Sequence, residues 1–493
     1  MSKAFLLGIL LLLPVLAICG EPNDDPAIPK NSNQGNLPLK KQTERITQEI
    51  LKNGKAYSDL QELTALGPRL SGSEGAEKAV RWAAAKMKSY QFDRVWLQPT
   101  SVPHWERGDQ ESAEILLPCG NVSLRLAALG NSAGTAPKGI TAQVIEVKSL
   151  KEVEELGNSL KGKIVFCNRP MNPSLKSTFQ AYGEAVDQRA EGPAAAAKFG
   201  AAAALVRSMT TLPDDDHPHT GVTLFQNSSR FQSDKAIPAA ALSVRSANEL
   251  SRALKKDPTL KVKLVLSART LPDVASYNVI GEVKGRQAPE NNEIVLVGGH
   301  LDSWDLGTGA HDDGTGVVQS IEVLRAMKSL GITPKRTVRV VLFMAEEFGA
   351  VGAKEYAKQA SLLKETHFAA IESDGGGGAP QGFGGGGKRR EVVDQLQVWL
   401  PYLQPLQAAS ITKNGGGADI GPLEESGTFT FGLIPDSTHY FDFHHSALDR
   451  IEAVNKSDLH KGAAAMAVFA YLLAEEGVPS KKAGEAPARP APR

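Results

Sequence analysis

The stretch that decides the fold is EIVLVGGHLDSWDLGTGAHDDGTG, residues 293–316. Its first part, EIVLVGG (293–299), is an almost unbroken apolar run, which is typical of a strand that is covered on both faces. A polar, glycine-rich loop follows, and a helix is expected over residues 315–330. The pattern is therefore strand, loop and helix, with the polar residues concentrated in the loop.

The same alternation continues along the chain. TVRVVLFMA (337–345) predicts the next strand, GAKEYAKQA (352–360) the next helix and HFAAIES (367–373) a further strand. Strands that alternate with helices in this way predict an α/β fold, in which a mixed, mostly parallel sheet is flanked by helices.

Acidic and histidine side chains follow these strands directly. His300 comes after the first strand and Asp374 after the third, while the pair Glu346–Glu347 comes after the second. In open α/β sheets, ligands bind at the edge formed by the carboxyl ends of the strands. Taken singly, each residue has an ordinary explanation, such as a structural histidine or a solvated glutamate pair. Their common position at one sheet edge favours a metal site instead.

The set is large enough for two metal ions, each bound through nitrogen and oxygen atoms. Two ions about 3.5–4 Å apart can share a bridging water and make it a nucleophile near neutral pH. Asp312 lies between the His300 loop and the glutamate pair, so we expect it to bridge the two ions. The remaining ligands would be His300 and Asp374 for one ion, and Glu347 with either His444 or His445 for the other.

Two acidic residues have roles beside the metal ligands. Adjacent side chains on an extended strand point in opposite directions, so Glu347 can ligate while Glu346 faces the water. Glu346 is expected to be the general base, which takes a proton from the water and passes it to the leaving amine. Asp302 is placed to hydrogen-bond the His300 ring and fix its tautomer. Such a site would suit a metal-dependent hydrolase, and its predicted catalytic residues are Glu346 and Asp302.

The length and charge of the chain limit its organisation and partners. At 493 residues the chain is long for a single core, so two domains are expected. Residues 115–272 contain short strand patterns, one alanine-rich helix and no catalytic cluster, which predicts a smaller β-rich domain inserted between residues 42–114 and 273–476. Equal numbers of basic and acidic residues, 55 of each, do not indicate a nucleic-acid-binding surface.

Both ends of the chain are expected to lie outside the fold. A lysine followed by a long apolar run predicts a secretory signal peptide over residues 1–20, too short for a membrane span. The protein is therefore expected to be secreted or periplasmic. Residues 21–41 are expected to be a linker, and residues 477–493 a disordered tail.

The three cysteines bear on export and stability. Cys19 lies at the end of the predicted signal peptide and is a candidate for lipid attachment. Cys119 and Cys167 would stay in the exported chain, where disulfides can form. They form either one disulfide or two buried thiols, and the sequence leaves both alternatives open.

Several motifs together resemble the co-catalytic zinc exopeptidases, an aminopeptidase-like family. The motifs are HLDSWDLGTGAHDDGTG (300–316), AEEFGAVGA (345–353), ESDGG (372–376) and FHHSALD (443–449). The resemblance extends over most of the chain after the linker. It implies the zinc exopeptidase fold with two Zn²⁺ per chain, peptide substrates, a homodimer, and a protease-associated domain for the insert at 115–272.

The resemblance also implies the roles of single residues. The ligands it implies are His300, Asp312, Glu347, Asp374 and His445, with Glu346 as the base. His445 is favoured over His444 because the last ligand of the family lies four residues before an aspartate, here Asp449. Asp419 resembles a residue that lies next to the ligands. Arg450 departs from the threonine that is usual after this aspartate, and this difference bears on substrate choice.

Three functions compete at this stage. The leading one is a secreted di-zinc exopeptidase that hydrolyses dipeptides or short peptides. A non-catalytic binding protein on the same scaffold would have lost metal ligands, and a glutaminyl-cyclase-type aminoacyltransferase would need fewer metals. The sequence does not decide between an aminopeptidase, which needs an acidic group for the substrate amine, and a carboxypeptidase, which needs a basic clamp.

Overall fold

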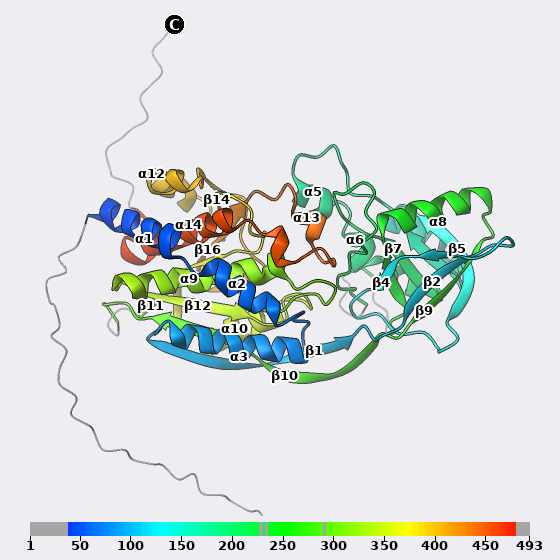
Figure 1. Ribbon diagram of the computed structural model, residues 1–493, viewed down its shortest axis with the longest axis horizontal. Coiled ribbons are helices and arrows are strands. Elements are labelled where there is room, and N and C mark those ends of the chain that lie inside the picture. The colour runs from blue at the N-terminus through cyan, green and yellow to red at the C-terminus, as the bar shows by residue number, and fades with distance from the viewer. Residues whose placement is uncertain (1–37, 226–229, 232–234, 289–291, 480–493) are drawn as a thin grey trace, which may run out of the picture. The chain divides into compact units, whose positions relative to one another are not determined.

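The decisive apolar run forms β11 (Glu293–His300), a central strand of an eight-stranded sheet. The computed structural model describes residues 38–225, 230–231, 235–288 and 292–479. These residues form two sheets of eight strands each, with helices packed around them. The two sheets lie side by side, and the long ribbon of β1 and β10 extends from the first toward the second (Figure 1).

The first sheet contains the predicted strands. In spatial order it consists of β1 (Arg94–Glu106), β10 (Arg269–Val283), β12 (Thr337–Phe343), β11, β13 (Thr366–Glu372), β16 (Phe429–Pro435), β14 (Pro380–Gly385) and β15 (Ser410–Thr412). The four strands β12, β11, β13 and β16 run parallel to one another, whereas β10 and β14 pair antiparallel with β12 and β16. The expected mixed α/β sheet is confirmed, with its parallel strands in the centre.

Helices cover both faces of the first sheet, as buried parallel strands require. They are α3 (Glu74–Ser89), α9 (Thr315–Leu330), α10 (Val351–Leu362) and α14 (Lys456–Glu475), with short α11 (Val392–Leu396) and α12 (Leu400–Leu403) between β14 and β15. On β11, Leu296 joins the buried cluster under α10, whereas Gly299 faces the start of α9. Because strand residues alternate between faces, α9 and α10 lie on opposite sides of the sheet.

The fold begins earlier in the chain than expected. α1 (Leu39–Asn53) starts inside the predicted linker 21–41, and α2 (Ala56–Ala65) follows it. Ile46 and Ile50 of α1 are fully buried. Both residues lie in the part of the fold expected from residue 42, so only the polar first turn, residues 39–41, falls in the predicted linker. The predicted signal peptide, Cys19 and the rest of the linker lie outside the described residues.

The second sheet takes all its strands from residues 111–266, which we call the second segment. In spatial order they are β3 (Val122–Leu124), β2 (Glu111–Leu116), β9 (Lys261–Leu266), β5 (Ile140–Val147), β6 (Ile164–Cys167), β7 (Ala203–Arg207), β8 (Ala239–Leu242) and β4 (Leu126–Ala128). The chain changes sheets at residues 107–110 and 267–268, a few residues before the expected boundaries of 115 and 272.

The second segment contains more helix than the sequence pattern indicates. Its helices are α4 (Leu150–Leu156), α5 (Thr178–Gly183), α6 (Asp187–Ala190), α7 (Gly192–Lys198) and α8 (Val244–Lys256). α7 is the expected alanine-rich helix. α8 is missing from the prediction, although Val244, Ala247, Leu250 and Leu254 are buried at helical spacing. Polar residues outnumber these apolar ones along α8, so the overall texture of the sequence hid the period.

The cysteines and the chain end can be placed in part. Cys119 is exposed and Cys167 is buried, and both are free thiols, so neither expected alternative is correct. α14 ends at Glu475, and residues 480–493 of the expected tail lie outside the described residues. Among the residues that the structure describes, no helix is long and apolar enough to span a bilayer.

A buried chain of hydrogen bonds joins β12 and β13 to α10. The Arg339 guanidinium donates to the Tyr356 hydroxyl (2.8 Å), which lies 2.7 Å from His367 Nε2 and donates to it. Arg339 also pairs with Glu282 and Glu365. Burial, followed by repulsion from Arg339, lowers the pKa of His367 to about 4. The neutral ring therefore belongs to the folded state.

Acidification should destabilise the fold through His367. Below the ordinary pKa of 6.5 the unfolded chain binds a proton at this ring, whereas the folded chain does not do so until the pH approaches 4. The free energy of unfolding should therefore fall by about 2 kcal/mol between pH 7.5 and pH 5 from this group alone. His367→Asn keeps a partner for Tyr356 and should remove that component, as measured by urea denaturation. An equal pH dependence in both proteins would exclude His367 as its source.

Candidate metal centre

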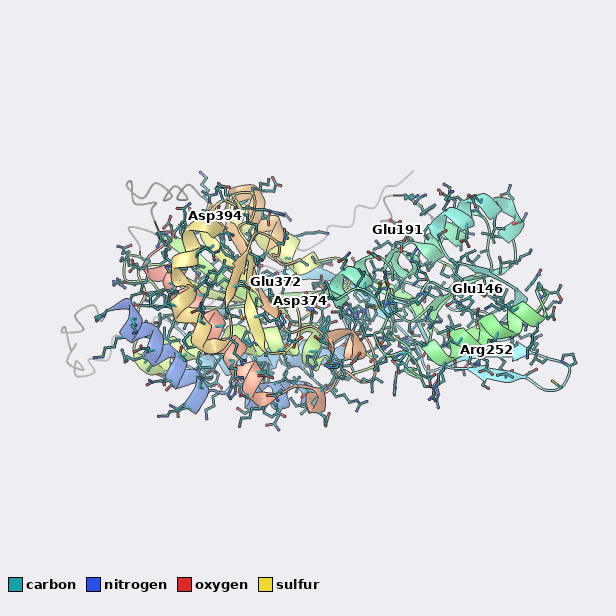
Figure 2. The ribbon with its side chains drawn as sticks, turned by 90° about the horizontal axis from the view of Figure 1, so that it is seen from above. Glu146, Glu191, Arg252, Glu372, Asp374 and Asp394 are labelled. Carbon is teal, nitrogen blue, oxygen red and sulfur yellow. The ribbon has the colours of Figure 1, made fainter. Side chains whose placement is uncertain are left out.

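The ends of the central strands bring the first ligand candidates together. His300 is the last residue of β11 and lies opposite Phe343, the last residue of β12. Asp374 follows the end of β13 by two residues. Glu372 and Asp374 lie close to each other near the junction of the two sheets (Figure 2). The parallel strands thus deliver these side chains to one edge.

His300, Asp312 and Asp374 form the first cluster, with ligand atoms within 4.8 Å of one another. His300 Nε2 lies 3.1 Å from Asp312 Oδ1 and 3.5 Å from Asp374 Oδ1. His300 Nδ1 donates to the main-chain carbonyl of Asp302 at 3.1 Å, which leaves the Nε2 lone pair facing two carboxylates. Since ionised carboxylates only accept, a cation between the three groups would satisfy all of them.

Asp312 also belongs to a second cluster, with His444 and His445. Its Oδ2 lies 3.1 Å from His445 Nε2 and 3.7 Å from His444 Nε2. Glu347 Oε2 lies 3.2 Å from the same His445 nitrogen. The two oxygens of one carboxylate therefore face two separate groups of ligands, which is the arrangement expected of a bridging residue.

Asp302 holds the glutamate pair more directly than the histidine ring. Its carboxylate accepts hydrogen bonds from the backbone N–H groups of Glu346 (3.1 Å) and Glu347 (3.4 Å). The expected contact with His300 comes from the Asp302 main chain, because the carboxylate Oδ1 is 3.6 Å from the ring nitrogen, too far for a hydrogen bond. The buried Asp302 thus fixes the turn that carries both glutamates.

That turn replaces the strand end expected for the glutamate pair. β12 stops at Phe343, and Ala345 has a positive φ of 62°, which redirects the chain before Glu346. Strand alternation therefore does not separate the two side chains. Glu347 is buried and accepts a hydrogen bond from Trp304 Nε1 (2.5 Å), whereas Glu346 is partly exposed. The turn gives the two carboxylates different surroundings.

Burial of these carboxyl groups shifts their pKa values strongly. Burial raises the pKa of Glu346 well above its ordinary range, and neighbouring carboxylates reinforce the shift. Burial also raises the pKa of Asp374. For Asp312, burial acts in the same direction, but contacts with His300 and His445 outweigh it and lower the pKa well below its usual range. The site concentrates negative charge that a bound cation would stabilise.

Two buried oxygens support this fit. Asp312 Oδ2 and Glu347 Oε1 find no hydrogen-bond partner among the described residues. A buried polar atom without a partner costs free energy, so such atoms in a native site call for an explanation. The imidazole nitrogens and carboxylate oxygens around Asp312 are ligand atoms that suit Zn²⁺. The residues present therefore fit a zinc centre.

A buried arginine, Arg69, holds the loop that precedes Asp312. It was not identified from the sequence. Arg69 is fully buried, and its guanidinium donates to the carbonyls of Leu301 (2.8 Å), Thr308 (2.5 Å) and Gly309 (2.9 Å). These carbonyls lie in the loop that leads to Asp312. The partners are 232 to 240 residues from Arg69 along the chain, so no local pattern indicates the contact.

A further pair of buried acids lies beside the first cluster. Glu372 Oε2 accepts hydrogen bonds from the backbone N–H groups of Asp419 (3.0 Å) and Ile420 (2.9 Å). Burial, followed by repulsion from Asp374, raises the pKa of Glu372 to about 8. Burial, followed by repulsion from Glu372, raises the pKa of Asp419 well above its ordinary range. The family resemblance indicated Asp419 as a neighbour of the ligands, whereas Glu372 was part of a family motif but was given no role.

The second segment also reaches the site, although its sequence contains no catalytic cluster. Arg189 Nη1 lies 3.2 Å from His445 Nδ1, and the Thr220 N–H donates to the His445 carbonyl at 2.9 Å. His219 Nδ1 lies 2.7 Å from the His444 carbonyl and donates to it. The surroundings of the histidine pair are therefore built by residues that the sequence gave no reason to select.

Comparisons with known proteins identify the class of this fold and site. The profile of Peptidase family M28 matches residues 278–470, which include the candidate ligands and Glu346. The chain belongs to this peptidase family, because a relative that is identical at more than a third of the aligned positions covers most of its length. That relative is carboxypeptidase Q: the chain is 37% identical to the Bos taurus protein over 429 residues, 86% of each chain. The figures for the Homo sapiens protein are the same.

Solved structures agree with this assignment. The Peptidase M28 precursor from Shewanella amazonensis SB2B superposes with a TM-score of 0.83 at 35% identity, over 90% of this chain and 98% of that one. BSAP, a zinc aminopeptidase from Bacillus subtilis, superposes with a TM-score of 0.62 at 22% identity, over 86% and 96%. The second likeness shows a shared fold alone. The family expected from the motifs is confirmed.

Replacing Arg69 should destabilise the protein. Arg69→Met leaves three loop carbonyls without their buried donor, which should lower the free energy of unfolding by about 3 kcal/mol or more. Denaturation midpoints in urea would measure the loss. Arg81→Met is the matched control, because Arg81 is exposed on α3 and pairs only with Glu77 among the described residues, so its loss should change stability little. Equal midpoints for the two variants would contradict this role of Arg69.

Proposed function

We propose that this peptidase is a di-zinc exopeptidase that hydrolyses dipeptides or short peptides. The observation that carries the proposal is the position of Asp312, whose two carboxylate oxygens face two ligand clusters. His300 and Asp374 would hold one zinc ion with Asp312, and Glu347 and His445 would hold the other. The names of the relatives, carboxypeptidase Q and zinc aminopeptidase, support peptides as the substrate class.

The choice of His445 as a ligand is part of the proposal. Its Nε2 is nearer to Asp312 Oδ2 than that of His444, 3.1 Å against 3.7 Å, and only His445 has Glu347 at the same nitrogen. The rings of the two histidines stack with centroids 3.5 Å apart. His444 therefore packs behind the ligand in this scheme.

Glu346 is the proposed general base. When bound, the zinc ions would polarise the scissile carbonyl and make an attacking water more acidic. Glu346 would accept the proton of that water and deliver it to the leaving amine. Asp302 fixes the Glu346 backbone, so the base is held at a constant position relative to Glu347. The positive charge of bound metal would lower the raised pKa of Glu346, which keeps the carboxylate ready to accept a proton.

The proposal also includes export and assembly. Residues 1–20 would direct the chain out of the cell, so that it acts as a secreted or periplasmic enzyme, and residues 115–272 would form a protease-associated domain. The binding-protein and cyclase alternatives gain no support from the site, since all five proposed ligands and the base are present in the chain. A homodimer is expected from the family resemblance and would appear as twice the chain mass in solution.

The first experiment combines metal analysis with a substrate panel. Purified protein should contain about two zinc ions per chain, and a chelator should abolish hydrolysis of dipeptides. Substrates with a blocked amino or carboxyl terminus would show which terminus is recognised. One metal or none, with no cleavage of any dipeptide, would contradict the di-zinc peptidase.

Glu346→Gln should separate metal binding from catalysis. The amide cannot accept the proton, so kcat should fall by about 10²- to 10⁴-fold while both zinc ions are retained. Turnover and zinc content of the same preparation would be measured together. Glu355→Gln, at a carboxylate of α10 that pairs with Lys358 outside the site, should leave both unchanged. Near-normal turnover of Glu346→Gln would show that another group is the base.

Asp312→Ala should remove metal as well as activity. Both clusters lose their shared carboxylate in this variant, so zinc content should drop to one ion or fewer per chain. Asp313→Asn is an instructive comparison, because Asp313 is buried next to Asp312 but accepts from the backbone N–H groups of His300 and Gly316. It should retain more zinc than Asp312→Ala, and the reverse order would argue against Asp312 as the bridge.

A further inference from the structure

The loop at residues 437–446, which carries both histidines, packs on the second segment. Phe179 of α5 stacks on Tyr440 of α13 (Tyr440–Phe443), with ring centroids 5.4 Å apart. Tyr182 of α5 stacks on Phe441 at 4.6 Å. Tyr440 and Phe441 belong to one buried apolar cluster with Ala181 and Ala185 of the second segment, and Tyr182 packs against it. The loop is therefore supported by a part of the chain that supplies none of the proposed ligands.

Hydrogen bonds from the second segment fix the backbone at the histidine pair. His219 Nδ1 donates to the His444 carbonyl (2.7 Å), while its Nε2 lies 2.9 Å from Asp215 Oδ2. The Thr220 N–H donates to the His445 carbonyl (2.9 Å). His445 has a φ of +60°, in the left-handed region that a residue with a side chain rarely adopts. Its backbone conformation is thus held by contacts from the second segment.

The ring of His445 is oriented from the same side. His445 Nδ1 lies 3.2 Å from both the Thr220 carbonyl and Arg189 Nη1, and Arg189 Nη1 also donates to the Thr220 carbonyl at 3.2 Å. Arginine can only donate and a carbonyl can only accept. When His445 Nε2 binds a metal, Nδ1–H must donate, so the Thr220 carbonyl is its acceptor and Arg189 holds that carbonyl.

Arg189 contacts the His445 ring on the side opposite the proposed zinc ion. It contacts Nδ1 of His445, whereas Asp312 lies at Nε2, on the other side of the ring. The guanidinium is buried over the Tyr182 ring (5.6 Å), and a Cβ at Gly221 would lie 2.3 Å from its Cζ. The second segment itself therefore packs against the guanidinium on these sides. In this inference Arg189 is a positioning residue, which acts on His445 from the side opposite Asp312.

Glu347 is the proposed ligand that would share a zinc ion with His445. Its contact with the second sheet runs through Trp304. Trp304 Nε1 donates to Glu347 Oε2 at 2.5 Å. The Trp304 ring lies in the same buried cluster as Phe166 of β6 and Leu205 of β7. Its edge is so close to Gly130 that a Cβ there would lie 2.3 Å from the ring. The core of the second sheet thus fixes the donor that orients Glu347.

His300 and Asp374 have no comparable link to the second segment among the described contacts. His300 Nδ1 donates to the Asp302 carbonyl, and its backbone N–H donates to Asp313 Oδ2 (3.1 Å). Asp313 Oδ1 accepts in turn from the N–H of Gly316 at the start of α9 (2.9 Å). These partners all belong to the first sheet and its connections.

We propose that the second segment positions one half of the metal centre, the Glu347–His445 half, and sets how tightly that half binds metal. Arg189, the Thr220 main chain and Trp304 are the contacts through which it acts. The His300–Asp374 half is held by the first sheet and does not depend on them. The inference rests on the proposed function, because it requires two metal sites in the chain.

Stepwise zinc release from the full-length holoenzyme tests this inference. Zinc would be titrated off with a competing chelator, which gives two apparent dissociation constants for the unmodified protein. Arg189→Met and Trp304→Phe should each leave one of these dissociation constants unchanged and raise the other by about 10- to 100-fold. Arg252→Met is the matched control, because Arg252 is exposed on α8 of the same segment (Figure 2), and both of its steps should match the unmodified protein.

Combination with Asp374→Asn assigns the steps. Asp374 belongs to the other half, so Asp374→Asn should raise the zinc dissociation constant that Arg189→Met leaves unchanged. The double variant should show both dissociation constants raised. If Arg189→Met does not fold, Trp304→Phe replaces it in this combination. Unchanged zinc release from both Arg189→Met and Trp304→Phe, or loss of the same step as in Asp374→Asn, would overturn the inference while the di-zinc enzyme stands. Fewer than two zinc ions in the unmodified protein would overturn both.

Discussion

The structure is organised around one electrostatic constraint: several carboxyl groups are buried together at one edge of a sheet. Asp302, Asp312 and Glu347 are each less than a tenth exposed, and they lie beside Glu346 and Asp374. Carboxylates this close cannot all ionise unless positive charge or hydrogen-bond donors compensate. Histidines, backbone N–H groups and the proposed zinc ions supply that compensation. The parallel strands and the loop that Arg69 holds carry these groups, and the proposed role of the second segment is to position the histidine pair.

The parts predicted correctly share a physical reason. The central strands are buried on both faces, so they appear in the sequence as apolar runs, and helices alternate with them along the chain. Once these strands are located, their ends locate His300 and Asp374 without any knowledge of the loops. Asp312 required one further assumption, that a carboxylate between two ligand groups would bridge them.

The parts that the sequence did not reveal are contacts between distant segments. Arg69 and Arg189 look like ordinary arginines in their local sequence, and only the fold brings them to Thr308 and His445. The glutamate pair shows a subtler limit. Its residues were assigned from a strand geometry that the structure replaces with a turn held by Asp302. Residue type and edge position were sufficient to find the pair, but not to describe its conformation.

The order of segments along the chain has a consequence for biosynthesis. Every residue of the second segment, 111–266, precedes His300, so this segment is synthesised before any proposed ligand. Domains tend to fold as units in the order of their synthesis. The surface that receives residues 437–446 is therefore synthesised before the histidines of the candidate metal centre. The loop that carries both histidines is the last of these parts to be made, and it packs against a segment made much earlier.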